Sequence, residues 1–412
     1  MPKKIEKELI IGLDIGTSKV AALVGEVSPE GQIDIVGIGS CPSRGLKRGV
    51  VVNIESTVQS IQRAAEEAEL MAGCEIHAAY AGIAGGHIRS FNSHGIVAVR
   101  DEEVNAADID RVIDAAKAVA IPADQKILHI LPQEYIIDSQ DSIREPIGMS
   151  GVRLEAKVHM VTGSVSAAQN IVKCVRRCGL DVADIILEQL ASSHAVLTED
   201  EKELGVCLVD IGGGTTDIAI FTEGAIRHTA VIPIAGDQVT NDIAVALRTP
   251  TQAAEKIKVE FASVVIDNAS ANEKITVPSI HERPETTISS HALTEVVIAR
   301  YEELFNLVQG EIRRSGFGDF IAAGIVLTGG ASKVKGGFTL AEQIFQVPVR
   351  IGVPQHVGGL LEAVNNPIYA TGVGLLLHGY KRQYQNNDIR PALAPGFNGV
   401  WSRMKDWFHG NF

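Results

Sequence analysis

Long hydrophobic runs are missing from this 412-residue sequence, and no stretch approaches the ~20 apolar residues that a membrane-spanning helix needs. The amino-terminal stretch MPKKIEKELIIG also lacks an apolar segment, so we do not expect an export signal. Cysteine is scarce: five scattered residues indicate reduced thiols rather than a disulfide framework or a metal cluster. Only two tryptophans are present, and both lie in the last dozen residues.

Positive charge is also in short supply. The net charge of −13 and the isoelectric point of about 5.4 argue against nucleic acid as the main partner. The chain has no Gly-Lys dipeptide and therefore no P-loop, and its nearest GxGxxG candidate, residues 37–42, ends in proline. The length predicts two to four domains.

A glycine turn that occurs twice is the most informative feature. LDIGTSKVAALV (13–24) and VDIGGGTTDIAIF (209–221) match in their Asp-Ile-Gly segments, which begin at Asp14 and Asp210, 196 positions apart. The alignment treats two glycines, 213–214, as an insertion in the second copy. Each turn lies between the first two strands of its own antiparallel set, so the sequence predicts two α/β halves related by duplication.

The pattern of predicted elements agrees with this duplication. β-Branched, alternating runs predict three short strands within residues 9–40, followed by a helix at 55–72. The block 84–162 then interrupts the α/β pattern with a helix at 105–119 and two long strands. We interpret this block as an inserted subdomain, after which the second set of strands begins.

Glycine turns of this kind are suited to phosphate. Several N–H groups face a concave surface with no side chain in the way, and threonine and serine add hydroxyl donors. Two turns that face each other would grip a triphosphate from both sides, with Asp14 and Asp210 holding Mg²⁺ through its waters. A third glycine segment, residues 327–332, lies between a predicted strand and a helix, where its backbone would contact the rest of a nucleotide.

Four segments carry a resemblance to a known family. DIGTSK, VDIGGGTTDIAI, TGGASKVKG and PIYATGVGLLL are similar to the phosphate-1, phosphate-2, adenosine and connect-2 motifs of the actin/Hsp70/sugar-kinase ATPases. More narrowly, the whole chain resembles the FtsA family of bacterial cell-division actin homologues. This resemblance implies an actin-like duplicated ATPase fold, with two α/β lobes around a nucleotide cleft. The implied subdomains are 1A (1–83 and 163–204), 1C inserted in the first lobe (84–162), 2A (205–235 and 316–380) and 2B (236–315).

The resemblance also implies the residues that bind ATP, with Asp14 and Asp210 holding Mg²⁺. The implied nucleotide-binding residues are Asp14, Gly16, Thr17, Ser18, Lys19, Asp210, Gly212, Gly213, Gly214, Thr215, Thr216, Gly236, Glu255, Lys258, Gly329, Gly330, Ala331 and Lys333. The residue that orients the attacking water would be Glu188 or Gln189. The surrounding segment LEQLASSHAVL departs from the Pro-and-Ala pattern of the relatives, so we expect at most slow ATPase activity.

The carboxyl-terminal segment differs from the acidic body. Residues 380–412 carry five Lys/Arg against two Asp, and residues 381–399 have no periodicity, which predicts a flexible linker. In 400–412, a helix would gather large apolar side chains within roughly 120° of arc. These side chains are Val400, Trp401, Met404, Trp407 and Phe408. Docking on the core or in a protein groove remains open, but tryptophans beside basic residues favour a membrane-targeting helix at anionic lipids.

Energetics suggest that one such tail binds weakly. Five apolar side chains would gain about 1.5–2 kcal/mol each on burial, but much of that is lost in folding and immobilising so short a helix. Many tails on one polymer would raise the avidity by orders of magnitude. We therefore expect membrane attachment to be coupled to self-association into protofilaments.

The predicted helix 292–314 carries an apolar stripe that Arg300 interrupts. One interpretation is that Arg300 extends out of a core edge. The other is an exposed groove, with Arg300 and Glu303 binding a partner. The resemblance favours the groove, because subdomain 2B of the FtsA family is where the carboxyl-terminal tail of the tubulin homologue FtsZ docks.

These features predict an ATP-binding, actin-like cell-division protein on the cytoplasmic face of the inner membrane at the division site. It would polymerise there, anchor the FtsZ ring and recruit downstream division proteins. Two alternatives share the cleft: a type IV pilus assembly ATPase and a small-molecule kinase. Neither would use an amphipathic tail, and a kinase would also need a carboxylate for its acceptor hydroxyl.

Overall fold

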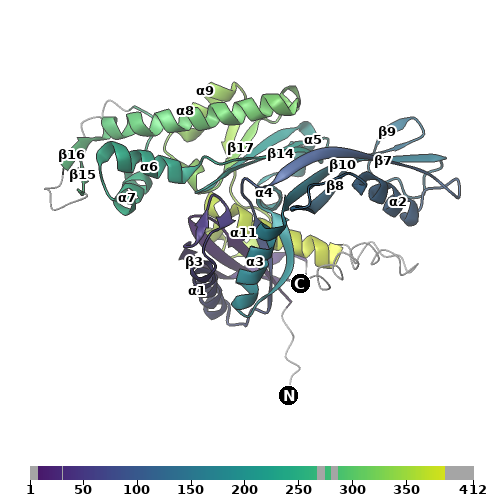
Figure 1. Ribbon diagram of the computed structural model, residues 1–412, viewed down its shortest axis with the longest axis horizontal. Coiled ribbons are helices and arrows are strands. Elements are labelled where there is room, and N and C mark those ends of the chain that lie inside the picture. Colours follow the sequence, from purple (N-terminus) through teal and green to yellow (C-terminus); the bar gives the residue numbers. More distant parts are fainter. Residues whose placement is uncertain (1–7, 30, 267–273, 280–285, 386–412) are drawn as a thin grey trace, which may run out of the picture.

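The computed structural model describes residues 8–29, 31–266, 274–279 and 286–385, which form two α/β lobes and an inserted subdomain (Figure 1). The first lobe is built on a sheet with the order β11-β6-β1-β2-β3-β19. Its strands are β1 (Leu9–Ile15), β2 (Lys19–Val27), β3 (Ile33–Pro42), β6 (Ala78–Ile83), β11 (Asp181–Leu187) and β19 (Val357–Gly359). The second lobe has a sheet with the order β14-β13-β12-β17-β18. Its strands are β12 (Val206–Ile211), β13 (Thr216–Thr222), β14 (Ala225–Ile232), β17 (Ile325–Thr328) and β18 (Val349–Ile351).

The two sheets share one topology. In each lobe three antiparallel strands are followed by two strands that pair in parallel, so that β3-β2-β1-β6-β11 corresponds to β14-β13-β12-β17-β18. Strand β19 is an addition at the β3 edge of the first lobe. The predicted duplication of an α/β unit is confirmed.

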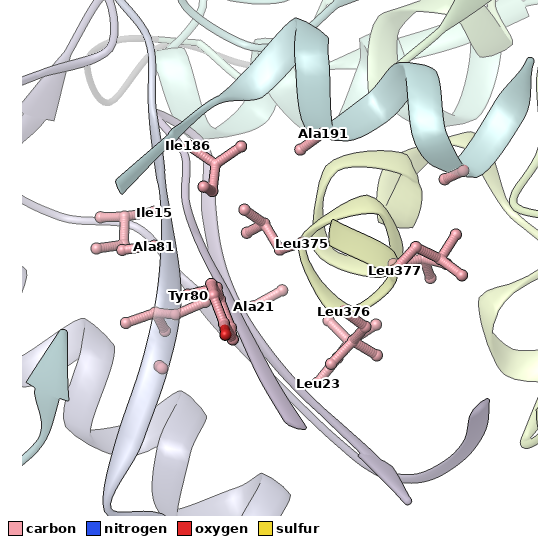
Figure 2. Packing of buried hydrophobic residues seen from close by; sticks show 14 of the residues in the cluster. Ile15, Ala21, Leu23, Tyr80, Ala81, Ile186, Ala191, Leu375, Leu376 and Leu377 are labelled. Carbon is pink, nitrogen blue, oxygen red and sulfur yellow. The ribbon is translucent and has the colours of Figure 1, made fainter. Parts of the chain in front are cut away.

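Four helices pack on the first sheet. They are α1 (Ile54–Ala72), α3 (Val165–Arg177), α4 (Glu188–Val196) and α11 (Ala370–Tyr380). Two of them, α4 and α11, also contact β12 of the second lobe. Helix α11 is apolar on nearly every side, as expected of a helix enclosed by other elements, and its leucines meet β1, β2, β11 and α4 (Figure 2). It crosses α4 so closely that a side chain on Gly374 would collide with the carbonyl group of Ala191. This crossing connects the two lobes next to the cleft.

The inserted subdomain has a sheet and a small core of its own. Its sheet order is β7-β10-β8-β9, with strands β7 (Arg89–Ala98), β8 (Gln125–Ile137), β9 (Gln140–Ile143) and β10 (Arg153–Ser164), and α2 (Ala106–Lys117) packs on it. Side chains of this sheet bind carbonyl groups of β14 in the second lobe: Ser90 Oγ donates to Thr229 at 2.9 Å, and Gln133 Nε2 donates to Ile226 at 2.8 Å. Strand β8 also contacts β11 of the first lobe, so the insert contacts both lobes.

The upper left of Figure 1 is occupied by α6 (Gly236–Leu247), α7 (Thr251–Phe261), the hairpin β15 (Lys274–Val277) and β16 (Thr286–Ser289), and α8 (Ser290–Ser315). Helix α8 begins after its cap Ser289 and ends at Gly316 in the left-handed conformation. Most of its apolar stripe, including Leu293, Val297 and Leu304, is buried in the core of the second lobe. The predicted exposed groove along this stripe is therefore wrong, because the stripe covers the hydrophobic core.

Short elements complete the described chain. They are β4 (Leu46–Lys47), β5 (Val50–Val51), α5 (Glu199–Leu204), α9 (Gly337–Phe345) and α10 (Leu361–Val364). After α11 the backbone continues as a π-helical turn, Lys381–Gln385, so the linker predicted from residue 381 cannot start before residue 386. The rest of that linker and the predicted membrane-targeting helix at 400–412 lie outside the described residues. Among the described residues, no helix has the length and hydrophobicity needed to cross a membrane.

Candidate functional site

The two glycine turns have the same backbone geometry. Gly16 N–H donates to the carbonyl of Lys19 at 3.0 Å, and Gly212 N–H donates to the carbonyl of Thr215 at 3.0 Å. The flanking pairs are Ile15 with Val20 in the first lobe and Ile211 with Thr216 in the second. The turns are therefore equally long, and the predicted two-residue insertion is wrong. A constant offset of 196 pairs Lys19 with Thr215 and Ala21 with Asp217.

The turns face each other across the lobe boundary. A side chain on Gly213 would collide with the hydroxyl of Ser18. A Cβ on Gly214 would lie 2.5 Å from Thr17 Oγ1 and 2.8 Å from the backbone Cα of Arg48. The glycine run is required by this close approach of the two lobes.

A cavity of about 500 Å³ lies between the turns and extends toward α7 and α8. Its size is in the range usual for small-molecule sites. Every residue assigned above to the nucleotide site lines it, as does Glu188, with one exception. The exception is Thr216, which is fully buried and donates its hydroxyl to the carbonyl of Ile234 at 2.7 Å, so it points away from the cavity. The structure adds lining residues that the motifs did not indicate: Gly49, Asp217, Val259, Ala262, Tyr301, Val334, Pro367, Ile368 and Thr371.

On the first-lobe side, Asp14 has a cationic partner. Lys19 Nζ lies 2.8 Å from the carboxylate of Asp14 and 5.4 Å from the centre of the Tyr369 ring. The lysine is only partly exposed, and the carboxylate is nearly buried. Lys19 therefore neutralises this wall of the cavity.

On the second-lobe side, Asp210 has hydroxyl partners instead. Oδ2 of Asp210 accepts a hydrogen bond from Ser192 Oγ at 2.6 Å, and Thr371 Oγ1 lies 3.4 Å from the same oxygen. Burial raises the pKa of Asp210 to about 6, although the Ser192 hydrogen bond acts in the opposite direction. This wall therefore carries a poorly compensated negative charge at neutral pH.

Asp217 strengthens that charge. It is buried, its Oδ2 accepts a hydrogen bond from Thr215 Oγ1 at 2.8 Å, and its Oδ1 has no hydrogen-bond partner in the described part of the chain. Burial and the charge of Asp210 raise the pKa of Asp217 to about 7. Sequence reasoning missed Asp217, although it stands opposite Asp210 in the β12–β13 register.

The predicted water-orienting residues differ in placement. Glu188, the first residue of α4, lines the cavity. Burial and the carboxylates of Asp14, Asp217 and Asp210 raise the pKa of Glu188 well above its usual value. Gln189 is fully buried and lies outside the cavity lining, and neither polar atom of its amide has a hydrogen-bond partner among the residues that the structure describes.

The far end of the cavity has both polar and apolar lining residues. Lys258 Nζ contacts Glu255 at 2.7 Å and the carbonyl of Gly236 at 3.2 Å, which places three predicted residues together. The lining also includes Ala262, Tyr301, Val334 and Ile368. An apolar slot beside a charged pair suits a heteroaromatic base attached to a sugar.

The side chains of this part of the cavity decide whether it suits Mg²⁺ and a polyphosphate. Four carboxylates line this part of the cavity against the single nearby Lys19, and one oxygen of Asp217 is buried without a partner. Among the described residues, no cluster of three or more His, Cys, Asp or Glu side chains has the geometry to enclose a metal. The residues fit a cation held through its waters and shared with phosphate oxygens, which is the binding mode usual for Mg²⁺.

The predicted partner-binding residues lie elsewhere, on α8. The Arg300 guanidinium binds both carboxylate oxygens of Asp242 on α6, at 2.5 and 2.9 Å, and also pairs with Glu303. Asp242 raises the pKa of Arg300. Arg300 thus lies at the edge of the core with its charge already satisfied, and an incoming carboxylate would have to replace one of these partners.

Comparison with known proteins finds two matching family models. One, described as cell division protein FtsA, matches residues 207–374, and the other, described as the SHS2 domain inserted in FtsA, matches residues 85–162. The cell division protein FtsA of Pseudomonas aeruginosa is 67% identical over 410 residues, which cover 98% of each chain. Those of Neisseria meningitidis and Escherichia coli K12 are 50% and 46% identical and cover 99% and 100% of both chains, respectively. The second family model coincides with the predicted insert.

Solved structures with a similar fold are more distant in sequence. The PilM-PilN type IV pilus biogenesis complex has a TM-score of 0.65 at 16% identity, and the match covers 90% of this chain and 98% of that one. MreB5 of Spiroplasma citri bound to ADP has a TM-score of 0.55 at 16% identity, with 92% and 97% covered. These likenesses show that the fold is actin-like, as predicted.

Proposed function

The chain belongs to the FtsA family of cell division proteins, and from this we propose that it is an ATP-binding, actin-like adaptor that polymerises on the cytoplasmic face of the inner membrane and attaches the FtsZ ring there. One observation carries the nucleotide part of the proposal: two equivalent glycine turns face each other across a cavity walled by Asp14 and Asp210. The relatives' name favours division over pilus assembly, since the PilM likeness reports only the fold.

Each part of the cavity has a role in this proposal. The N–H groups of the two turns bind phosphate oxygens, with the hydroxyls of Thr17 and Thr215 beside them. Asp14 and Asp210 hold Mg²⁺ through its waters, and the bound ion neutralises phosphate charge. The ribose lies at Glu255 and Lys258, and the adenine lies in the apolar slot beside Tyr301.

Hydrolysis is slow in this proposal. The segment around Glu188 departs from the pattern of the relatives, and Gln189 does not line the cavity. ATP therefore acts mainly by holding the two lobes together in the polymerising state.

The membrane and partner functions rest on the family and on the sequence. The segment 400–412 attaches the polymer to anionic lipid, and the FtsZ tail docks on subdomain 2B beside Arg300 and Glu303, where its carboxylates compete with Asp242. Other division proteins are recruited to the assembled polymer.

Electron microscopy on an anionic lipid monolayer tests this proposal. The full chain with Mg²⁺ and ATP should form filaments on the lipid, and the full chain without nucleotide should not. A chain lacking 400–412 should still bind ATP, measured by calorimetry, but leave the lipid bare. The proposal would be contradicted if the chain lacking 400–412 still bound the lipid. It would also be contradicted if filaments formed equally well with and without ATP.

A further inference from the structure

The Asp210 carboxylate is held by hydroxyls from the two helices that connect the lobes. Ser192 belongs to α4 and Thr371 to α11, and their oxygens lie 3.0 Å apart. Ser192 is fully buried, and Thr371 is 8% exposed. Neither residue was indicated by the glycine motifs.

Counting protons gives the direction of these hydrogen bonds. Ser192 has one hydroxyl proton, and its 2.6 Å contact with a carboxylate uses it, because a carboxylate only accepts. The contact between Ser192 and Thr371 at 3.0 Å must then be donated by Thr371. The two hydroxyls form a relay in which Thr371 orients Ser192, and Ser192 orients Asp210.

The relay fixes which oxygen of Asp210 faces the cavity. Both hydroxyls contact Oδ2, whereas Oδ1 lies beside Gly329, which lines the cavity. Gly329 has a φ of +83°, a left-handed conformation that favours glycine. Oδ1 is therefore the oxygen available to a ligand in the cavity.

We propose that Ser192 and Thr371 are positioning residues that orient the Asp210 carboxylate toward the Mg²⁺ of a bound nucleotide, and that through them cation binding is coupled to the α4–α11 crossing. The proposal rests on the nucleotide-binding function proposed above. Lys19 supports Asp14 directly from its own turn, whereas Asp210 depends on two helices from outside its sheet. At the crossing, the two helices approach so closely that a Cβ on Gly374 would lie 1.8 Å from the carbonyl oxygen of Ala191.

Three variants distinguish the effect of the Ser192 and Thr371 hydroxyls on ATP binding from the effect of side-chain packing. Thr371→Val keeps the shape and removes the hydroxyl, Thr371→Ser keeps the hydroxyl and removes a methyl group, and Ser192→Ala breaks the relay at its centre. ATP affinity is measured by calorimetry on the full chain, once in excess Mg²⁺ and once in EDTA, together with the melting temperature of the nucleotide-free protein.

In excess Mg²⁺, Ser192→Ala and Thr371→Val should bind ATP roughly tenfold more weakly than the wild type, at the low end for residues that orient metal ligands. In EDTA the three proteins should bind ATP within about twofold of one another. Thr371→Ser should keep the wild-type affinity in Mg²⁺, even though it removes buried packing.

Two results would overturn the inference and leave the nucleotide site intact. The first is a wild type and a Ser192→Ala variant with equal affinity in Mg²⁺. The second is an equal loss for Thr371→Ser and Thr371→Val, which would assign the effect to packing. A wild type that binds no ATP in Mg²⁺ would instead refute the proposed function itself.

Discussion

The two glycine turns are alike in backbone and unlike in charge. Both close with the same hydrogen bond and both place an aspartate on the cavity wall. In the first lobe, position 19 is a lysine that neutralises Asp14, and position 21 is a buried alanine. In the second lobe, the equivalent positions are Thr215 and Asp217, so the wall gains an acid and has no lysine.

This difference shows what duplication preserved and what diverged. The strand register, turn length and sheet order are common to both lobes, because they determine where the phosphate-binding N–H groups lie. The charge of the side chains around the two turns, by contrast, differs between the lobes. The second lobe buries carboxylates whose raised pKa values oppose folding at neutral pH, a loss of stability of the kind found at functional sites. A bound cation would relieve it and stabilise the protein.

The largest expected effect comes from making the second turn like the first. Gly214 is equivalent to Ser18, so Gly214→Ser gives the second lobe the residue that the first lobe already has. Its Cβ would lie 2.8 Å from the backbone Cα of Arg48, so the lobes must separate. We expect at least a hundredfold loss of ATP affinity by calorimetry, consistent with the ~3 kcal/mol that severe overpacking costs.

The reverse substitution is the matched control. Ser18→Gly removes an exposed hydroxyl whose side-chain contact is with Asp237 at 3.3 Å, so affinity should fall by less than about tenfold. Equal effects of Gly214→Ser and Ser18→Gly would mean that the two turns are interchangeable, and the comparison between lobes would fail.

A smaller effect, on the free energy of unfolding, is expected when Asp217 is replaced by a neutral residue. The pKa of Asp217 is about 7 in the folded protein, above the value of 3.8 usual for aspartate. The folded state therefore binds this proton more tightly, which favours folding at low pH and opposes it as the pH rises from about 4 to about 7. Asp217→Asn should stabilise the nucleotide-free protein at pH 8 by about 2 kcal/mol, given ~1.4 kcal/mol for each unit of pKa and some loss in the buried site.

Urea unfolding at several pH values checks this prediction. The gain of Asp217→Asn over the wild type should shrink as the pH falls toward 4, because the wild-type carboxyl is then protonated in the folded state. Buried histidines with lowered pKa values, such as His129 and His159, change the stability of both proteins alike and cancel in the difference. A gain that is the same at pH 5 and pH 8 would show that folding does not raise the pKa of Asp217 above about 5, because the folded and unfolded states would then bind the same number of protons over this range.

The sequence predicted the elements that glycine, β-branched and capping residues mark. The strands beside both turns, the insert and the long helix were found, since each has a local signal in periodicity or turn chemistry. The apolar stripe of α8 was harder to interpret. A stripe has the same period whether it covers a core or lines a groove, and only the fold shows that Val297 and Leu304 are buried.

The site was predicted where residues are close in sequence to a glycine motif. Ser192 and Thr371 reach Asp210 from helices that are distant in the chain, and no local pattern indicates such a contact. The relative register of the two turns was also misjudged. Aligning the two turns by their hydroxyl residues required an insertion at residues 213–214. The strand pairing instead aligns Thr215 with Lys19 and requires no insertion.

The smallest effect concerns the cation that distinguishes the first turn. Lys19→Gln keeps most of the side-chain length but removes the positive charge beside Asp14. The negative charge of Asp14 on the first-lobe wall would then lack a cationic partner, as that of Asp210 does on the second-lobe wall. The pair is largely shielded from solvent, and we expect the nucleotide-free protein to lose about 1 kcal/mol in urea unfolding. Lys173→Gln, on the exposed face of α3, is the control and should change stability by less than about 0.5 kcal/mol. If both substitutions have the same small effect, Lys19 does not compensate Asp14, and the two walls of the cavity differ only through Asp217.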